Sequence, residues 1–350
     1  MPSSQPPGAT LQVNAQQSRH YPSRPALEVL ICTHQRARLL ARALDSLEAA
    51  ARPADCPLGV FVVANACSDD TPRLLAERAA ATDTARLPLR WIVDPVPGKS
   101  HALNLALPQA RAPLIAFVDD DHRLDPGYLL ALVEAARTQP EAELFCGRIL
   151  PDWDGSEPAW VHDQGPYRIY PLPVPRFDLG AEPHPVVPGS ATPGGGNLAI
   201  RQGLFARIGP FRLELGPHGH NLGGAEDIEW VKRAVTSGAP LHYVPGMCQY
   251  HYVEADRMTL GYVLRKAYER SASTLRIAPS EHPHRWPPRY MLRKVVGYGL
   301  RALFALGWPA RRFYLTRLAA ALGEIKGFSQ QVRDPRPESP SGSDPDAPTR

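Results

Sequence analysis

From Leu27 onward, short apolar runs alternate with segments long enough to form helices, and this alternation restricts the possible folds more than any other feature of the sequence. The expected strands are at 29–31, 60–63 and 114–118, and the expected helices are at 38–51, 71–81 and 126–138. Strands that alternate with helices predict a parallel sheet covered on both faces. We therefore expect an α/β fold with a mostly parallel central sheet, helices on both faces and further helices near the C-terminus.

Composition limits the class of protein. The chain has 350 residues, of which 43% are apolar, and this is enough to bury a sizeable core. Its formal net charge is +4, and the arginines are scattered along the chain, so nothing indicates a nucleic-acid partner. The five cysteines form no C-x-x-C pair and no regular framework. Together with the polar N-terminus, which lacks a secretion signal, these features predict a cytoplasmic protein.

Four regions follow from the distribution of proline and apolar residues. They are a disordered tail at 1–25, a globular domain at 26–275, a helical segment at 276–330 and a second disordered tail at 331–350. In the helical segment, arginines interrupt apolar stretches that are far shorter than the roughly 20 residues needed to span a bilayer. Two interpretations remain open for this segment: helices that lie in an anionic membrane surface, or a helical pair packed on the globular domain.

Polar clusters follow three of the expected strands, at the edge of a parallel sheet where ligands bind. Two of them, Thr33–Arg36 and Asn65–Thr71, could equally be turns and a helix cap. The third, Asp119-Asp120-Asp121, places three carboxylates side by side, which is costly without a compensating cation. Asp125-Pro126 already supplies a cap for the next helix, which leaves the triplet without a structural task. Such hard oxygen ligands suit Mg²⁺ or Mn²⁺.

Four other segments carry weaker signals. Gly98–Asn104 places Lys99 at a helix start, where free N–H groups favour anions. The glycines of Gly194–Asn197 either let the backbone approach a ligand or only bend a loop. Glu226-Asp227 opens another helix, as dipole stabilisation alone would select, and His251 is either a packed histidine or a ligand.

Taken in order, these segments resemble the family 2 glycosyltransferases of the GT-A fold, over about 27–273. The resemblance implies an inverting, metal-dependent transfer of a sugar from a nucleotide-diphosphate sugar to an acceptor hydroxyl. It makes Asp227 the general base and makes Asp121 and His251 ligands of the metal. It also implies contacts to the nucleotide sugar from Thr33, Arg36, Asn65, Asp69, Lys99, Asn104, Asp119 and Asp120, and to the substrate from Gly195, Gly196, Asn197 and Glu226.

The sequence departs from the family pattern at a few positions. Ala64 stands where the family commonly has an aspartate associated with reading the base, although uridine remains the expected base. Cys32 and His34-Gln35 replace other common residues, which we interpret as tolerated variation. The Q-x-x-R-W motif of processive synthases is absent, so we expect one sugar per encounter. The expected acceptor is a sugar or a lipid-linked molecule of cell-surface polysaccharide or glycolipid assembly, with the enzyme in the cytoplasm or peripheral at the inner face of the membrane.

Two other classes of function stay open at this point. Metal-dependent phosphotransfer enzymes and phosphatases also place aspartates after central strands of parallel sheets. A catalytically silent carbohydrate-binding protein is the other, with Trp153 and Trp160 as stacking platforms. Release of a nucleoside diphosphate from a nucleotide sugar distinguishes a glycosyltransferase from both.

Overall fold

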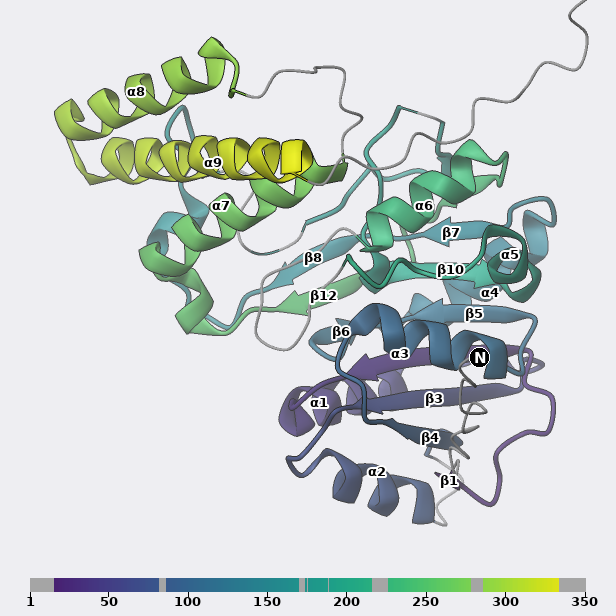
Figure 1. Ribbon diagram of the computed structural model, residues 1–350. Coiled ribbons are helices and arrows are strands. Elements are labelled where there is room, and N and C mark those ends of the chain that lie inside the picture. Colours follow the sequence, from purple (N-terminus) through teal and green to yellow (C-terminus); the bar gives the residue numbers. More distant parts are fainter. Residues whose placement is uncertain are drawn as a thin grey trace, which may run out of the picture. The chain divides into compact units, whose positions relative to one another are not determined.

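The computed structural model describes residues 16–81, 86–169, 174, 176–187, 189–215, 226–277 and 286–333. The chain divides into two compact units (Figure 1). The first contains residues up to 158 together with 171–258, and the second contains 159–170 and the residues from 259 onward. The sequence predicts a boundary at residue 275, whereas the structure groups the helix Leu260–Ile277, which runs through that position, with the C-terminal helices.

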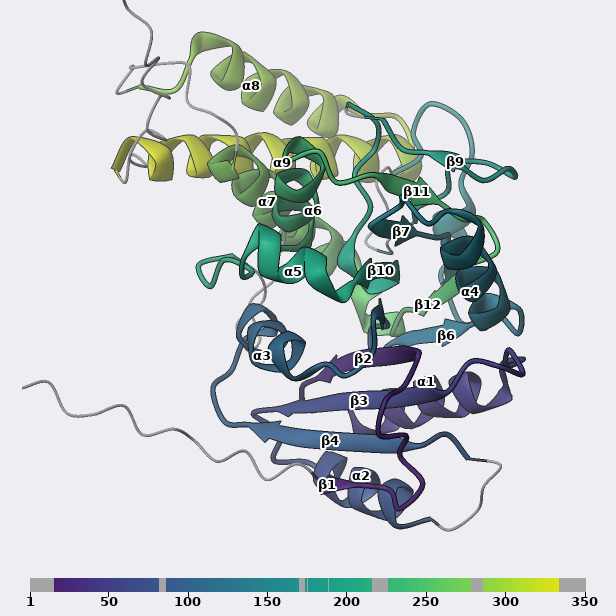
Figure 2. The ribbon, with the colours of Figure 1, turned by 90° about the vertical axis from the view of Figure 1, so that its right-hand side faces the viewer.

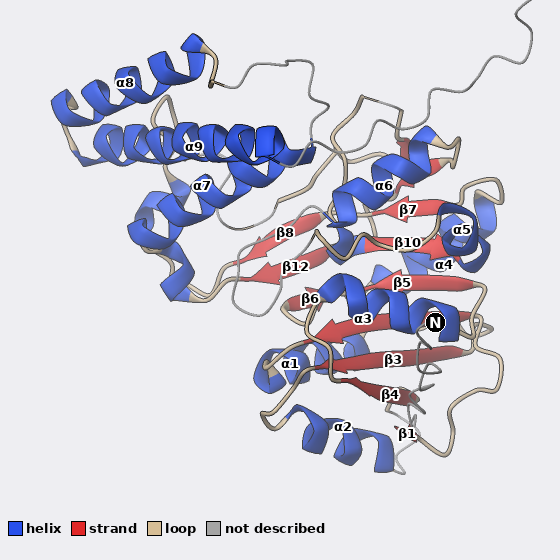
Figure 3. Ribbon diagram, viewed as in Figure 1, coloured by secondary structure: helices blue, strands red, loops and turns tan. Residues whose placement is uncertain are grey.

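A nine-stranded sheet forms the centre of the first unit, in the order β1-β4-β3-β2-β5-β10-β7-β11-β9. Several of its strands are labelled in Figure 3. Its strands are β1 Gln16–Gln17, β2 Leu27–Thr33, β3 Leu58–Asn65, β4 Leu89–Asp94, β5 Leu114–Phe117, β7 Leu144–Cys146, β9 His184–Pro185, β10 Leu198–Arg201 and β11 Leu241–Tyr243. The run β4-β3-β2-β5 is parallel; β2, β3 and β5 are the three expected strands, whereas β4 is not predicted from the sequence. Most of its apolar side chains are buried on both faces, and Val93 of β4 is an exposed exception. Beyond β5 the sheet is mixed, because β10 is antiparallel to both of its neighbours.

Helices cover both faces of this sheet (Figure 2). One face packs against α1 Ala37–Ala49, α2 Thr71–Ala80 and α4 Tyr128–Thr138, and the other against α3 Lys99–Ala106, α5 Gln202–Ile208 and α6 Glu226–Thr236. The expected α/β architecture is therefore confirmed. The helix expected from residue 126 begins two residues later, because the Asp125 carboxylate accepts the N–H of Gly127 in a turn before the helix.

A second, three-stranded sheet in the order β6-β12-β8 also belongs to the first unit. It contains β6 His122–Leu124, β8 Ile149–Asp152 and β12 Gln249–Tyr252. β12 pairs antiparallel with β6, and in this register His251 lies opposite His122. The small sheet therefore brings a histidine from late in the chain beside the aspartate triplet. Short 3₁₀ turns at Leu107–Gln109, Gly195–Asn197 and Ala255–Met258 complete the unit.

The folded part of the chain begins before residue 25, the predicted end of the N-terminal tail. β1 pairs with the edge strand β4, and the Tyr21 side chain is buried against the ion pair of Glu28 and Arg90. The polar, proline-rich composition of the segment gives no indication of these contacts, because they are made with residues distant in sequence. The remainder of the expected N-terminal tail, 1–15, lies outside the described residues.

The second unit consists of the 3₁₀ turn Ala159–His162 and the helices α7 Leu260–Ile277, α8 Arg289–Phe304 and α9 Trp308–Arg333. α7 and α9 pack closely: a Cβ atom added to Gly323 would lie 2.1 Å from the carbonyl oxygen of Tyr268. α9 extends to Arg333, past the predicted limit at residue 330, and the rest of that predicted tail lies outside the described residues. No helix among the described residues is long and apolar enough to cross a membrane.

Candidate active site

The three aspartates follow β5, and each is held by a protein partner. Asp119 accepts a hydrogen bond from Lys99 Nζ at 2.6 Å. Asp120 accepts one from Thr33 Oγ1 at 2.7 Å and one from Arg36 Nη1 at 3.1 Å. The same Arg36 nitrogen lies 2.9 Å from Asp121 Oδ2. The expectation that the triplet has no structural task is therefore wrong, because basic side chains from the start of α3 and from the residue before α1 already offset much of its repulsion.

These neighbours set different pKa values along the triplet. Burial and the adjacent Asp121 raise the pKa of Asp120 to about 6, although Arg36 and Thr33 oppose that shift. Burial alone would raise the pKa of Asp121 as well, but His251, His122 and Arg36 outweigh it and hold that pKa well below its usual range. Asp121 is therefore the member of the triplet that stays ionised most firmly.

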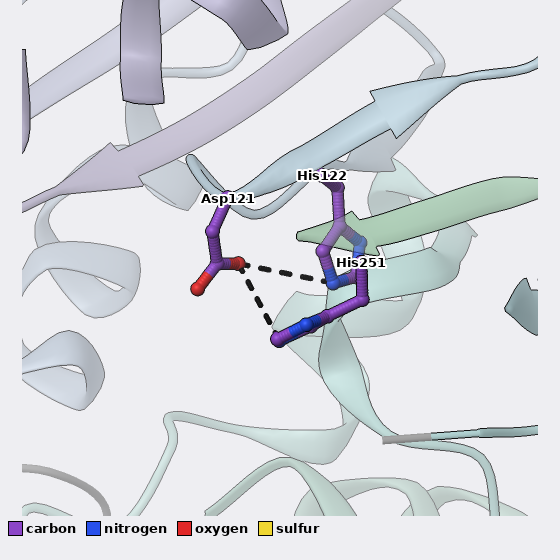
Figure 4. Close-up of side chains that lie close together, drawn as sticks. All are labelled: Asp121, His122 and His251. Atoms are coloured by element: carbon purple, nitrogen blue, oxygen red, sulfur yellow. Dashed lines mark ion pairs between the residues drawn. The ribbon is translucent and has the colours of Figure 1, made fainter. Parts of the chain in front are cut away.

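Asp121 faces two histidines (Figure 4). Its Oδ1 lies 3.9 Å from His122 Nε2 and 3.8 Å from His251 Nε2. One donor atom from each of the three residues falls within 4.8 Å of the others, which is the separation expected around one metal ion. The sequence predicts Asp121 and His251 for this role but misses His122. Its position directly after the triplet was the available signal, and only the pairing of β6 with β12 shows its proximity to His251.

The hydrogen bonds of Gln249 assign the tautomer of His122. Gln249 Nε2 donates to the carbonyl oxygen of Phe117 at 3.3 Å and to Asn197 Oδ1 at 3.2 Å, so its Oε1 is the acceptor. His122 Nδ1 lies 2.6 Å from that Oε1 and must therefore carry the proton. In the neutral form of this ring the lone pair is therefore on Nε2, the nitrogen that faces Asp121. A hydrogen bond of this kind, which orients an imidazole from behind, is typical of metal-binding histidines.

His251 also fits a metal site. Burial lowers its pKa to about 4, with His122 adding to the shift and Asp121 opposing it, so the ring is neutral near pH 7. Its Nδ1 is buried and has no hydrogen-bond partner among the described residues. Two imidazole nitrogens and one firmly ionised carboxylate form a donor set suited to a divalent transition metal such as Mn²⁺.

A cavity that opens to solvent lies beside the triplet, on the face of the sheet that carries α3 and α6. Lys99, Asp119, Gly195 and Asp227 supply its polar lining, and Phe211 is among its apolar wall residues. Burial would lower the pKa of Lys99, but Asp119, Glu226 and Asp227 outweigh it and raise that pKa above its ordinary value. The cavity thus combines a permanent cation with two carboxylates, a combination suited to a phosphate-bearing ligand and a proton acceptor.

Only glycine fits at positions 195 and 196, because aspartate side chains lie too close for a Cβ atom. A Cβ atom on Gly196 would lie 2.5 Å from Asp119 Oδ2, and one on Gly195 would lie 2.7 Å from Asp227 Cβ. The N–H of Gly195 donates to Asp227 Oδ2, and the N–H of Ile228 donates to Asp227 Oδ1 at 2.7 Å. The glycines therefore let the backbone pass between the aspartate triplet and α6, and one of them orients the Asp227 carboxylate.

Glu226 is a buried acid with one carboxyl oxygen that lacks a hydrogen-bond partner among the described residues. Its side chain is 4% exposed, and Oε2 has no hydrogen-bond partner among the described residues. Burial and the neighbouring Asp227 raise its pKa to about 7, although Lys99 opposes the shift. Glu226 is therefore protonated over a wider pH range than an exposed glutamate. The preceding glycines of this motif, at 223 and 224, lie outside the described residues.

Glu226→Gln is expected to stabilise the protein at pH 8 and to have little effect at pH 5. A folded-state pKa above the unfolded one means that the native protein holds the extra proton, so stability is lost as pH rises from about 4.5 through 7. The amide does not titrate and avoids this loss, which is at most about 3 kcal/mol. Urea denaturation at both pH values measures it. Glu229→Gln is the matched control: Glu229 pairs with Arg233 at 3.1 Å, so its loss should destabilise at both.

Four other predicted contact residues use their side chains within the protein. Asn65 bonds to Asp94 and to the N–H of Gly98 at 2.6 and 2.9 Å, and Asn104 holds both backbone groups of Phe211 at 2.8 Å. Further bonds of the same kind are made by Asn197 to the carbonyls of Arg148 and Met247 and by Asp69 to the N–H groups of Ala37 and Thr71. These residues shape the loops around the cavity.

The structure brings the other predicted residues together at one edge of the sheet. They are Thr33, Arg36, Lys99, Asp119, Asp120, Asp121, Gly195, Gly196, Glu226, Asp227 and His251. Besides His122, the sequence analysis misses Asp94, which is 1% exposed and accepts hydrogen bonds from Asn65 and from His101 at 2.8 Å. Trp160, proposed as a stacking platform, has the Arg312 guanidinium 4.9 Å from its ring centre.

Comparisons with known proteins identify the family and the fold. Residues 28–204 match the family model described as Glycosyl transferase family 2. Two solved structures have the same fold: mannosyltransferase PcManGT from Pyrobaculum calidifontis, in complex with GDP-Man and Mn²⁺, and residues 1–349 of S. aureus TarS, in complex with UDP-GlcNAc. PcManGT shares 19% identity at a TM-score of 0.53, covering 93% of this chain and 91% of its own. TarS shares 15% at 0.50, covering 88% and 91%. No curated protein sequence matches the chain.

Proposed function

Since the chain belongs to glycosyl transferase family 2 and is a glycosyltransferase, we propose that it transfers a single sugar, with inversion, from a nucleotide-diphosphate sugar to an acceptor hydroxyl. The observation that carries this proposal is the position of Asp119. It shares the cavity with Lys99 and Asp227, and it belongs to the same triplet as Asp121, which faces His122 and His251. An anion-binding site, a proton acceptor and a metal donor set therefore adjoin one another.

The proposed cofactor is Mn²⁺ or Mg²⁺, held by Asp121, His122 and His251. When bound, such a cation neutralises the charge of the departing diphosphate. Arg36 binds Oδ2 of Asp121, whereas both histidines face Oδ1, so the carboxylate can hold the arginine and a cation through different oxygens. The presence of Mn²⁺ and GDP-Man in the PcManGT structure supports this assignment.

We assign Lys99 to the donor diphosphate. Its ammonium group lies at the first residue of α3, where free backbone N–H groups add to the attraction for an anion. Asp119 accepts a hydrogen bond from this ammonium group. The solved relatives hold GDP-Man in one case and UDP-GlcNAc in the other, so the fold accepts either base. Uridine is our default for this chain, with Ala64 as the position that sets it apart from the family pattern.

Asp227 is assigned as the general base. It takes the proton of the acceptor hydroxyl while the sugar passes through an oxocarbenium-like state. The hydrogen bonds from the N–H groups of Gly195 and Ile228 orient its carboxylate. Glu226 is less suited to this role, because its side chain is buried and largely protonated below pH 7. A single base, without a carboxylate nucleophile, is consistent with inversion.

The test is incubation of the purified chain with a panel of nucleotide sugars and Mn²⁺. Release of a nucleoside diphosphate, with mass spectrometry of the glycosylated product, is the expected result. Release of inorganic phosphate instead would indicate phosphatase chemistry. As acceptors we propose sugar or lipid-linked molecules of cell-surface polysaccharide or glycolipid assembly. The enzyme would then act at the inner face of the cytoplasmic membrane.

His122→Ala is expected to weaken Mn²⁺ binding about tenfold or more and to narrow a preference for Mn²⁺ over Mg²⁺, because imidazole ligands favour transition metals over Mg²⁺. Electron paramagnetic resonance of Mn²⁺ measures the affinity without any turnover, and chelation should abolish transfer in both proteins. His242→Ala, a substitution on β11, is the matched control and should retain the affinity. An unchanged Mn²⁺ affinity in His122→Ala would remove this histidine from the donor set.

A further inference from the structure

The second unit leaves a large apolar surface uncovered on α8 and on the turn that follows it. Leu292, Val296, Leu300, Leu303 and Phe304 recur at helical spacing and therefore lie on one side of α8. All five are exposed, with Leu303 and Phe304 at 68% and 74%. The opposite side of the helix is buried through Met291 and Ala302, and α8 packs there against α9. α8 is thus anchored on one side and unpartnered on the other among the described residues.

Aromatic residues lie at the ends of this surface. Trp286 precedes α8 and is 82% exposed, and Trp308 follows it with half of its surface exposed. Leu306, in the turn between the two helices, is 96% exposed. Tryptophan at the limits of an apolar helix face is typical of helices that lie at a lipid–water interface, because the indole ring has an apolar body and a polar N–H.

The charge of this region is of one sign. Between Trp286 and Gly323 the sequence contains seven basic residues and no acidic residue. Two of the seven are neutralised within the unit: Lys294 pairs with Glu324 at 2.9 Å, and Arg312 pairs with Asp163 at 2.5 Å. The other five have no described carboxylate within ion-pair distance and are Arg289, Arg293, Arg301, Arg311 and Arg317. Arg289 and Arg293 fall on the same side of α8 as the apolar residues.

We propose that this surface, formed by Trp286, the exposed side of α8 and the turn through Trp308, binds an anionic lipid bilayer. The inference adds the contact surface to the membrane location in the proposed function and rests on no step of catalysis. A second copy of the chain fits poorly, because it would place uncompensated arginines against each other. A bilayer surface offers both an apolar layer for Leu303 and Phe304 and phosphate groups for the arginines. The helix lies in the interface, with its long axis in the plane of the membrane.

The test is sedimentation of the full chain with vesicles of phosphatidylcholine alone or with 30% phosphatidylglycerol, without donor or acceptor. Binding to the anionic vesicles is expected, with partial release at high salt, because the apolar part of the contact is not screened. Arg289→Gln and Arg293→Gln should each lower the partition coefficient about fivefold. The double change Leu303→Ser, Phe304→Ser should lower the partition coefficient about tenfold or more. High salt should then release all of the protein that still binds the vesicles.

Matched controls lie in the first unit. Leu130→Ser removes an exposed leucine from α4, and Arg73→Gln with Arg137→Gln removes two exposed charges, and neither change should affect vesicle binding. Equal loss in these controls, or no binding to anionic vesicles, would overturn the proposal. A dimer in solution that Leu303→Ser, Phe304→Ser abolishes, without vesicle binding, would show that a second copy covers the surface. Nucleoside diphosphate release measured without vesicles tests the proposed function separately.

Discussion

Asp227→Asn is expected to lower the rate of glycosyl transfer about 10²- to 10⁴-fold while donor affinity persists. Asparagine has nearly the same shape and keeps one oxygen for the N–H of Gly195, so the loop through the glycines stays in place. It cannot accept a proton from the acceptor hydroxyl. Single-turnover rates at saturating donor, with donor affinity from calorimetry, separate the two effects.

Glu226→Gln is the matched control for that experiment, since Glu226 is the adjacent acid on α6 and lies outside the polar lining of the cavity. Its effect on the rate should be much smaller than that of Asp227→Asn. Two results would contradict the assignment. A larger loss in Glu226→Gln would transfer the role of base to Glu226. A collapse of donor affinity in Asp227→Asn would place Asp227 in the donor site.

Asp121→Asn is expected to abolish nearly all turnover and to weaken Mn²⁺ binding strongly. A neutral amide oxygen holds a hard dication far less well than a carboxylate does. Turnover with added Mn²⁺ and Mn²⁺ affinity by electron paramagnetic resonance both measure the loss. Turnover at the wild-type rate without any divalent cation would count decisively against a metal role for this aspartate.

The same substitution should also destabilise the metal-free protein. Repulsion within the triplet, considered alone, predicts a gain in stability, but the substitution removes the ion pair with Arg36 at 2.9 Å, and this arginine helps to hold the pKa of Asp121 below its usual range. A lowered carboxyl pKa stabilises the fold above the unfolded value near 4, and this stabilisation is lost as pH falls toward the folded value. We expect a loss of about 1–3 kcal/mol at pH 7 that shrinks below pH 4. Urea denaturation measures it, with Asp45→Asn as an exposed control.

The parallel core of the fold and the edge that carries the site could be predicted from the sequence. A strand that is buried on both faces must be continuously apolar, as 60–63 and 114–118 are, and the polar residues after such strands collect at one edge of a parallel sheet. The aspartate triplet, the first residue of α3 and the Glu226-Asp227 pair do lie at one edge of the sheet. The local pattern of apolar and polar residues is enough to predict this edge, because the end of each parallel strand fixes where the residues after it lie.

Only the tertiary structure decided which side chains meet and what each one does. His122 and His251 are opposite each other because β6 pairs with β12, and strand register over such a separation is set by packing across the whole unit. Lys99 and Arg36 offset the negative charge of the triplet. Gly195 and Gly196 leave space for the side chains of Asp227 and Asp119. The asparagines form hydrogen bonds with backbone groups. Each of these facts depends on distances between residues far apart in sequence. The apolar pattern of α8 likewise shows an amphipathic helix, and packing against α9 decides which side is left exposed.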